Sequence, residues 1–256
     1  MKDEIKKSWN DHSDEYYNRI YKVQDDTTIL KSDPMWAFPI PIRTILQDNF
    51  SDFHGLRVLV PSSGDNGAVF AFHLLGAKVT SSDISERQLE NAKRIADGEG
   101  WDIEFICADS MKLDGIADGF YDLVYTSNGV HTWIDDLNSM YRNFNRVLKQ
   151  GGRYIMFETH PFIRPFDDSG DEIKIIKDYN NTEGLHWRVM DLFNAMIGQG
   201  FEVLRMEEFH AEPGSHDLWW YKTRGEAEAD GNKKFNFINN LWAALPQWIG
   251  FSAVKI

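Results

Sequence analysis

The stretch "VLVPSSGDNGAVFAFHLLGAKVTSSDIS", from Val58 to Ser85, decides the fold. An apolar run of strand length is followed by a turn that contains glycine and by apolar residues suited to a buried helix. A second strand-like run then ends at Asp83. The pattern therefore predicts a strand, a helix and a second strand, with a carboxylate held where the second strand ends.

The same alternation continues to about residue 160. Further strands are predicted at "IEFICAD", "FYDLVYTSN" and "RYIMFETH", and later at "FEVLRMEEFH" and "WIGFSAVKI". Helices are predicted at "SERQLENAKRIADG", with Ser85 as N-cap and Gly98 as the stop, and at "WIDDLNSMYRNFNRVLKQGG", closed by its glycines. Alternating strands and helices predict a parallel sheet wound on both sides, with the strand ends gathered at one edge where ligands bind.

Composition excludes several classes of protein. The single cysteine, Cys107, rules out an internal disulfide and a cysteine-based zinc cage. The first residues are charged, and no apolar run approaches the roughly 18 residues of a membrane span, so we expect a cytoplasmic protein with no membrane partner. The net charge of −13 disfavours phosphate backbones, and we expect no nucleic-acid partner.

Asp83 follows the turn glycine by about twenty residues, a spacing that lets a carboxylate accept hydrogen bonds from two ribose hydroxyls. The alternative is an acid favoured by the helix dipole, or a cap that competes with Ser85. Because a strand, a turn and a helix precede Asp83, ribose binding is the favoured interpretation.

The turn "PSSGDNG" is poor in glycine. A dinucleotide turn needs G-x-G-x-x-G so that its backbone can approach a pyrophosphate, but only Gly64 and Gly67 are present. Asp65 is an anion that would oppose a bound phosphate. The turn thus predicts a ligand with a ribose and no pyrophosphate, and S-adenosylmethionine, a nucleoside that bears an amino acid, fits that description.

Taken together, these motifs resemble the class I S-adenosylmethionine-dependent methyltransferases of the small-molecule type. The resemblance is carried by the 58–67 loop, Asp83, "CADS", "YDLVYTSNGVHTWI" and "NRVLKQGGRYIMFETHPF", and "WNDHSDEYY" resembles the arm that many members fold over the cofactor. The family's acid near Val60 is absent, and Ser62 and Asn66 replace glycines. The resemblance implies an α/β fold: Rossmann-like, doubly wound, with a mostly parallel seven-stranded sheet and an antiparallel C-terminal strand.

The resemblance also implies where S-adenosyl-L-methionine would bind. Asp109 would accept the adenine amine, or else cap a turn, and Asn128 would bond the ligand or stabilise a turn. Tyr16, Tyr17 and Trp36 would close over the cofactor or pack the N-terminal arm against the domain. The remaining expected cofactor-binding residues are Pro61, Ser62, Ser63 and Gly64 for the methionine half, with Asp65 as a further candidate, and Ile84, Ala108 and Ser110 for the adenine.

Histidines and one glutamate are the candidate proton acceptors. His131 follows a strand near the expected reaction site and suits a general base, or else it packs at the start of the next helix. Glu158 and His160 are its rivals, and a base is needed only if the acceptor is protonated when bound. His160, His210 and His216 lack local metal-ligand spacing, so we predict no metal; His186, His210 and His216 are candidates for lining a substrate cap.

We expect one methyltransferase domain, residues 1–256, with an N-terminal helical arm (1–50), a cofactor-binding core (57–159) and cap insertions at 160–187 and 211–247. The aromatic runs at 218–222 and 235–248 would cover an acceptor pocket or form a dimer contact, which leaves monomer and homodimer open. The predicted function is in-line methyl transfer to a small-molecule acceptor. The alternatives are a nicotinamide-dependent oxidoreductase and a non-catalytic nucleoside-binding protein.

Overall fold

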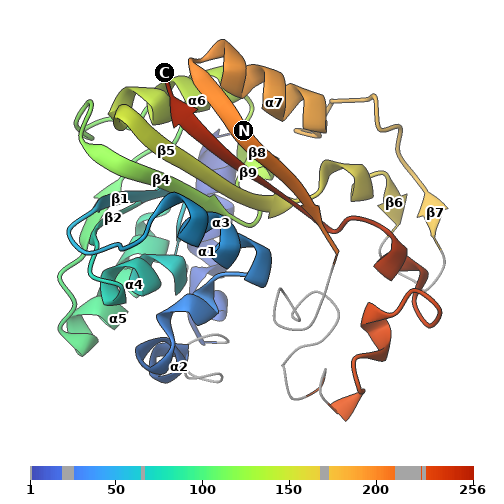
Figure 1. The fold of residues 1–256 in the computed structure, drawn as a ribbon, viewed down its shortest axis with the longest axis horizontal. Coiled ribbons are helices and arrows are strands. Elements are labelled where there is room, and N and C mark those ends of the chain that lie inside the picture. Colours follow the sequence, from blue (N-terminus) through green and yellow to red (C-terminus); the bar gives the residue numbers. More distant parts are fainter. Residues whose placement is uncertain (1, 19–25, 65–66, 168–172, 211–225, 227–228) are drawn as a thin grey trace.

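A seven-stranded sheet organises the chain in the computed structural model, which describes residues 2–18, 26–64, 67–167, 173–210, 226 and 229–256 (Figure 1). The strand order is β3-β2-β1-β4-β5-β9-β8; β9 runs antiparallel to β5 and β8, and the other pairs are parallel. The strands are β1 Arg57–Pro61, β2 Lys78–Asp83, β3 Glu104–Cys107, β4 Tyr121–Ser127, β5 Leu148–Thr159, β8 Phe201–Phe209 and β9 Trp248–Lys255. This confirms the predicted Rossmann-like sheet with its antiparallel C-terminal strand.

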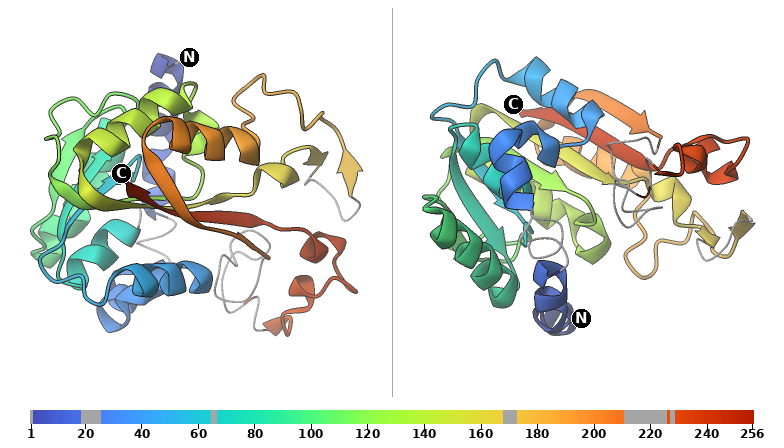
Figure 2. Two further views of the ribbon diagram at one scale, coloured as in Figure 1. Left: turned by 45° about the horizontal axis from the view of Figure 1, so that its top comes forward. Right: turned by 90° about the horizontal axis from the view of Figure 1, so that it is seen from below.

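Helices cover both faces of the sheet (Figure 1 and Figure 2). They are α1 Lys2–Tyr17, α2 Asp26–Ser32, α3 Ile40–Asn49, α4 Gly67–Leu74, α5 Glu86–Glu99, α6 Leu137–Val147 and α7 Val189–Gly198. Buried side chains from α2, α3, α4 and α5 pack on one face, and those from α6 and α7 pack on the other. In the part of the chain that the structure describes, no helix is long and apolar enough to cross a membrane.

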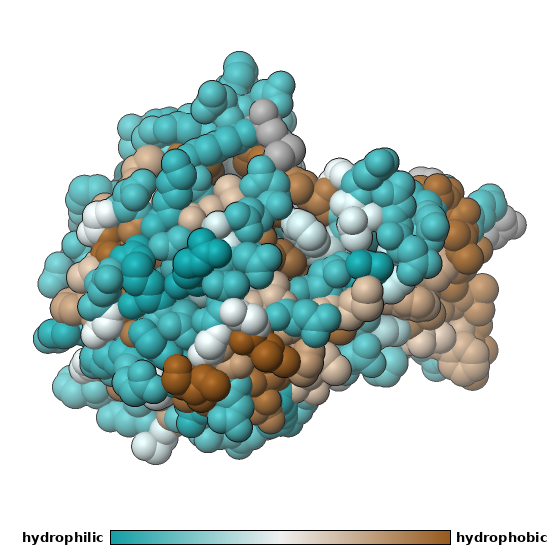
Figure 3. Space-filling model, turned by 90° about the horizontal axis from the view of Figure 1, so that it is seen from above, coloured by the Kyte–Doolittle hydropathy of each residue, from teal (hydrophilic) through white to brown (hydrophobic). Residues whose placement is uncertain are grey.

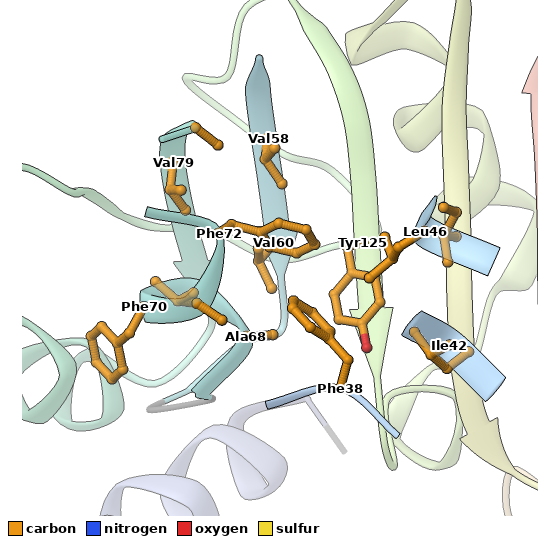
Figure 4. Packing of buried hydrophobic residues seen from close by; sticks show 14 of the residues in the cluster. Phe38, Ile42, Leu46, Val58, Val60, Ala68, Phe70, Phe72, Val79 and Tyr125 are labelled. Atoms are coloured by element: carbon orange, nitrogen blue, oxygen red, sulfur yellow. The ribbon is translucent and has the colours of Figure 1, made fainter. Parts of the chain in front are cut away.

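The central strands send alternate side chains into the two cores. Val58 and Val60 of β1 join the core under α4, whereas Leu59 between them joins the core under α6. Figure 4 shows the first core, in which the Phe72 ring of α4 packs at a tilt against Phe38 and edge-on against Tyr125, with ring centroids 4.9 and 5.3 Å apart. This packing holds β1 and β4 in register, and the candidate site lies at their carboxyl ends.

The order of the strands reverses between β1 and β4. From β1 the chain crosses to β2 and β3 on one side, and then returns to β4 and β5 on the other. In open α/β sheets, ligands bind in the crevice outside the strand ends at such a switch point. The five parallel strands β1 to β5 all have their carboxyl ends at this edge, so the loops that follow them begin there.

Two helix ends were wrongly predicted. Helix α5 continues through Gly98 and ends at Gly100, whose left-handed φ of 73° suits the cap. Helix α6 ends at Val147 rather than at the glycine pair, because Leu148 is buried and pairs with Tyr121 as the first residue of β5. Gly151 and Gly152 instead lie within β5, where the pairing with β4 shifts its register.

Short elements connect these parts. The segment after β5 contains a two-stranded sheet, β6 Phe166–Asp167 and β7 Lys174–Ile175. The 3₁₀ helices are η2 Pro34–Ala37, η3 His131–Trp133, η4 Pro161–Ile163, η6 Lys233–Phe235 and η7 Leu241–Ala244. The expectations for Asp65, Asn66, His216, residues 218–222 and the Tyr16 side chain fall outside what the structure describes.

Candidate active site

Asp83 is buried at the carboxyl end of β2, with 8% of its surface exposed. Its Oδ2 accepts the backbone N–H of Gly64 at 2.9 Å, and its Oδ1 accepts that of Ser85 at 2.8 Å. Burial raises the pKa of Asp83 to about 6. Each carboxylate oxygen can accept a further hydrogen bond, so Asp83 both braces the turn and keeps acceptor capacity for a ligand hydroxyl.

The turn after β1 is built from serines. The Ser63 hydroxyl lies 2.6 Å from the hydroxyl of Ser81 on β2, and the Ser63 N–H donates to the Ser82 carbonyl at 3.1 Å. Ser62 and Gly64 have left-handed φ angles of 49° and 52°. Ser62 stands where the family has glycine, and it pays a steric cost of the kind that concentrates at functional loops.

The loop after β3 meets the same turn. The Ser110 hydroxyl lies 2.7 Å from that of Ser62, and the Ala108 N–H donates to the Asp83 carbonyl at 2.9 Å. Both residues are buried, whereas Ile84 beside them is half-buried. The structure thus brings together the predicted residues of the loops after β1, β2 and β3.

Asp109 has two partners. Its Oδ1 accepts the N–H of Met111 at 2.9 Å, as a turn cap does, and its Oδ2 pairs with Lys2 Nζ of helix α1 at 2.7 Å. The cap that the sequence suggested as an alternative is therefore present. An amine at Asp109 would have to share the carboxylate with Lys2.

Helix α1 lies along this edge (Figure 2). Asn10 Oδ1 accepts the Ser85 hydroxyl at 2.6 Å, and Trp9 contacts Trp133 of η3 edge-on with ring centroids 5.5 Å apart. The Tyr17 ring lies 5.0 Å from the guanidinium of Arg94. Tyr17, and Trp36 of η2, also pack against the core, which is the packing role considered for these aromatic residues.

His131 and Glu158 form one buried network with Tyr141. Glu158 Oε1 accepts the N–H groups of Gly129 and Thr159, and its Oε2 accepts the N–H and Nδ1 of His131. His131 Nε2 lies 2.8 Å from the Tyr141 hydroxyl. Burial raises the pKa of Tyr141 well above its ordinary value, so this hydroxyl keeps its proton and can donate it to Nε2 while Nδ1–H donates to Glu158.

The Glu158 carboxylate is ionised in this network. Burial alone would raise its pKa, but the hydrogen bonds that Glu158 accepts from the side chain and the backbone of His131 outweigh burial and bring the pKa below its usual 4.5. Both ring nitrogens of His131 and both oxygens of Glu158 are engaged inside the protein. The arrangement fixes the loop after β4, and Asn128 is exposed there with a φ of 52°.

His160 forms a second acid–histidine pair. Its Nε2 lies 2.8 Å from Glu208 Oε1, and its Nδ1 accepts the N–H of Phe162 at 3.0 Å. Nδ1 is therefore unprotonated, and burial lowers the pKa of His160 despite the nearby Glu208. His160 is thus neutral, with both nitrogens engaged within the protein.

Residues 61–156 match the family described as "Methyltransferase domain". The chain is 27% identical over 139 residues to an uncharacterized methyltransferase of Bacillus subtilis, covering 54% of this chain and 53% of that protein. It is 35% identical over 103 residues to the ubiquinone/menaquinone biosynthesis C-methyltransferase of Desulfotalea psychrophila, covering 40% of each. These matches place residues 61–156 in a methyltransferase domain family and support the predicted resemblance to the class I S-adenosylmethionine-dependent methyltransferases.

The fold of this chain is also found in a solved structure, that of an S-adenosylmethionine-dependent methyltransferase from Mesorhizobium loti. The TM-score is 0.62 at 22% identity, over 83% of this chain and 96% of the other. The chain spans about half the length of the curated relatives it matches. The comparisons support the predicted family and confirm the predicted fold class.

Gln88 reaches the same site, although the sequence did not predict it. It is buried, and its Oε1 has no hydrogen-bond partner among the described residues. A Cβ built at Gly64 would lie 3.2 Å from this oxygen, so Gln88 reaches the turn after β1. The pattern S-x-x-Q from Ser85 was the available signal, since a residue three positions after an N-cap lies next to the cap.

Two other predicted histidines, His186 and His210, lie apart from the network of His131 and Glu158. His210 is exposed just after β8. His186 lines a separate pocket in the segment that follows β5.

Proposed function

We propose that this chain transfers a methyl group from S-adenosylmethionine to a small-molecule acceptor. The observation that carries the proposal is the buried Asp83 carboxylate at the end of β2, braced by Gly64 and with lone pairs to spare. It lies at the switch point of the sheet, beside a turn that lacks the glycines of a pyrophosphate site. The match of residues 61–156 to a methyltransferase domain family supports the same cofactor.

The residues present fit this cofactor. Asp83 would accept the ribose hydroxyls, and Ile84 would pack on the adenine. Asp109 would accept the adenine amine, with Ala108 and Ser110 beside the base. Tyr17 would support helix α1 over the cofactor. The methionine half would be held by Pro61, Ser62, Ser63, Gly64 and Asn128. The cofactor supplies an electrophilic methyl group on a sulfonium.

The protein's own part in the reaction would be positioning. Glu158 and His131 hold the loop that carries Asn128, and both are saturated with internal hydrogen bonds. Displacement at a sulfonium has a good leaving group, so orientation of the acceptor and exclusion of water can supply much of the rate. We therefore propose that Glu158, His131 and His160 position the strand ends, and that a base is needed only for a protonated acceptor.

Isothermal titration calorimetry with S-adenosylhomocysteine and S-adenosylmethionine tests the proposal. We expect both to bind and NADH not to bind. Asp83→Ala should weaken binding at least tenfold, about 1.4 kcal/mol, whereas Asp97→Ala on the exposed side of α5 should not.

Two results would contradict the proposal at different levels. Absence of binding at millimolar S-adenosylhomocysteine would refute the cofactor. Unchanged affinity in Asp83→Ala would refute only the ribose assignment.

A further inference from the structure

A pocket of about 520 Å³ lies entirely within the segment that follows β5. Its walls run from Pro161 to Trp187, and they include the aromatic rings of Tyr179 and Trp187. Three cationic or protonatable side chains also line it: Arg164, Lys177 and His186. Such a gathering is unexpected in a chain with a net charge of −13.

Two of the residues that line this pocket each have a buried polar atom with no partner in the described part of the chain. These atoms are Nε of Arg164 and Nδ1 of His186. Lys177 Nζ lies 3.5 Å from His186 Nε2, which places Nε2 as the acceptor and the ring proton on Nδ1. Both orphan atoms are therefore donors, and a buried donor without an acceptor costs about 1–3 kcal/mol.

The acidic side chains nearby do not satisfy these donors. Asp178 and Glu183 also line the pocket, but both are exposed, and Asp178 Oδ1 accepts the N–H of Asn180 instead. Glu158 acts on Arg164 through its charge, yet its oxygens are taken by four other donors. Burial, then the charges of Lys177 and Arg164, lower the pKa of His186, which is the effect of cations close together.

The pocket adjoins the candidate active site. Its first residue, Pro161, follows the end of β5 by two positions. The Trp187 indole N–H donates to the Ile134 carbonyl at 2.8 Å, which ties the far wall to the segment after η3 and β4. The segment that follows β5, with β6 and β7, projects from the sheet (Figure 1), and hydrophobic residues gather at that end of the molecule (Figure 3). Ile175 and Ile176 of this segment are exposed.

We propose that this pocket binds the acid group, a carboxylate or a phosphate, of a methyl acceptor with an aromatic or apolar body. This inference rests on the proposed methyl transfer. An oxyanion accepts hydrogen bonds from Arg164 Nε and His186 Nδ1 together, and a guanidinium suits the two oxygens of such a group. Tyr179 and Trp187 offer faces for the body of the acceptor.

Calorimetric titration of the full chain saturated with S-adenosylhomocysteine tests this. The probes are benzoate, phenyl phosphate and the neutral analogue benzamide. We expect at least one acid to bind and benzamide to bind at least tenfold more weakly. Arg164→Gln and the exposed Lys177→Gln should each weaken binding of the acid at least fivefold. Lys78→Gln should not, because the exposed Lys78 is the first residue of β2, at the end of the strand away from Asp83.

Each outcome is decisive. Equal binding of benzamide and the acids, no binding of either acid at tens of millimolar, or no effect of both pocket substitutions would overturn the proposal. Binding of benzoate alone would identify the acid group as a carboxylate, and binding of phenyl phosphate alone would identify it as a phosphate. S-adenosylhomocysteine is titrated first for every variant. If it does not bind the wild type, the proposed function is contradicted but the pocket proposal is not. The acids are then titrated into the protein without S-adenosylhomocysteine.

Discussion

At the scale of single residues, the buried carboxylate of Asp83 makes cofactor binding depend on pH. Its pKa of about 6 is raised by burial, and ribose hydroxyls donate to the ionised form. Affinity for S-adenosylhomocysteine should therefore be constant above pH 7 and fall as the pH drops through 6, approaching tenfold per unit below it. Calorimetry from pH 5 to 8 measures this, and Asp83→Asn should bind more weakly with a flat profile. A sloping profile in Asp83→Asn would assign the titration to another group.

The buried Glu158 carboxylate should make the stability of the fold depend on pH. Glu158→Gln replaces one oxygen with a donor that faces backbone N–H groups, and should lower the free energy of unfolding by about 1–3 kcal/mol at pH 7. Because the folded-state pKa of Glu158 lies below 4.5, its contribution is present above that pH and is lost as the pH falls further.

Urea denaturation across pH measures the loss, with Glu208→Gln as the matched control. Glu208 is the acid of the other acid–histidine pair, and its side chain is 56% exposed. A loss as large in Glu208→Gln as in Glu158→Gln would mean that burial of the network is not the cause.

At the scale of elements, helix α1 is held mainly by polar contacts. Arg87 of α5 pairs with Asp14 at 2.9 Å, Lys2 pairs with Asp109, and the Asn91 amide donates to Ser13 at 2.8 Å. Polar contacts near the surface weaken with salt, and elements with few apolar anchors open locally. Helix α1 is thus the element of the site best suited to open for ligand entry.

Hydrogen exchange followed by mass spectrometry tests this. Amides of α1 should exchange faster than those of α5, faster still in molar salt, and more slowly with S-adenosylhomocysteine bound. Arg87→Gln should accelerate exchange in α1, whereas Lys93→Gln should not, since Lys93 pairs with Asp97 on its own helix. Equal exchange in both variants would show that the Arg87 contact does not hold the helix.

At the scale of the whole molecule, packing of the core under α4 fixes the position of the candidate site. Phe72 is fully buried, and its ring packs against those of Phe38, Phe53 and Tyr125. Phe72→Ala should cost about 3–5 kcal/mol in the free energy of unfolding, measured with urea. Phe237→Ala, at a site 57% exposed, should change it by less than about 0.5 kcal/mol. A small effect of Phe72→Ala would mean that this core repacks freely.

The sequence by itself determined the succession of the main strands and helices along the chain, the sheet edge at which their loops gather, and Asp83 at the end of β2. Those properties follow from local periodicity and from the handedness of strand–helix–strand units. The predicted end of α6 at the glycine pair was wrong because pairing of Leu148 with Tyr121, a long-range contact, outweighs a local stop signal. The predicted end of α5 at Gly98 was wrong because Gly100, two residues later, takes the left-handed conformation of the cap.

Only the tertiary structure decided which polar groups meet. Glu158 and His131 are 27 residues apart, Ser62 and Ser110 are 48 apart, and Lys2 and Asp109 are 107 apart (109 − 2). The pocket with Arg164 and His186 likewise forms in a segment without regular periodicity. Hydrogen bonds act over about 3 Å, and no local pattern encodes which distant groups the packed sheet brings within that distance.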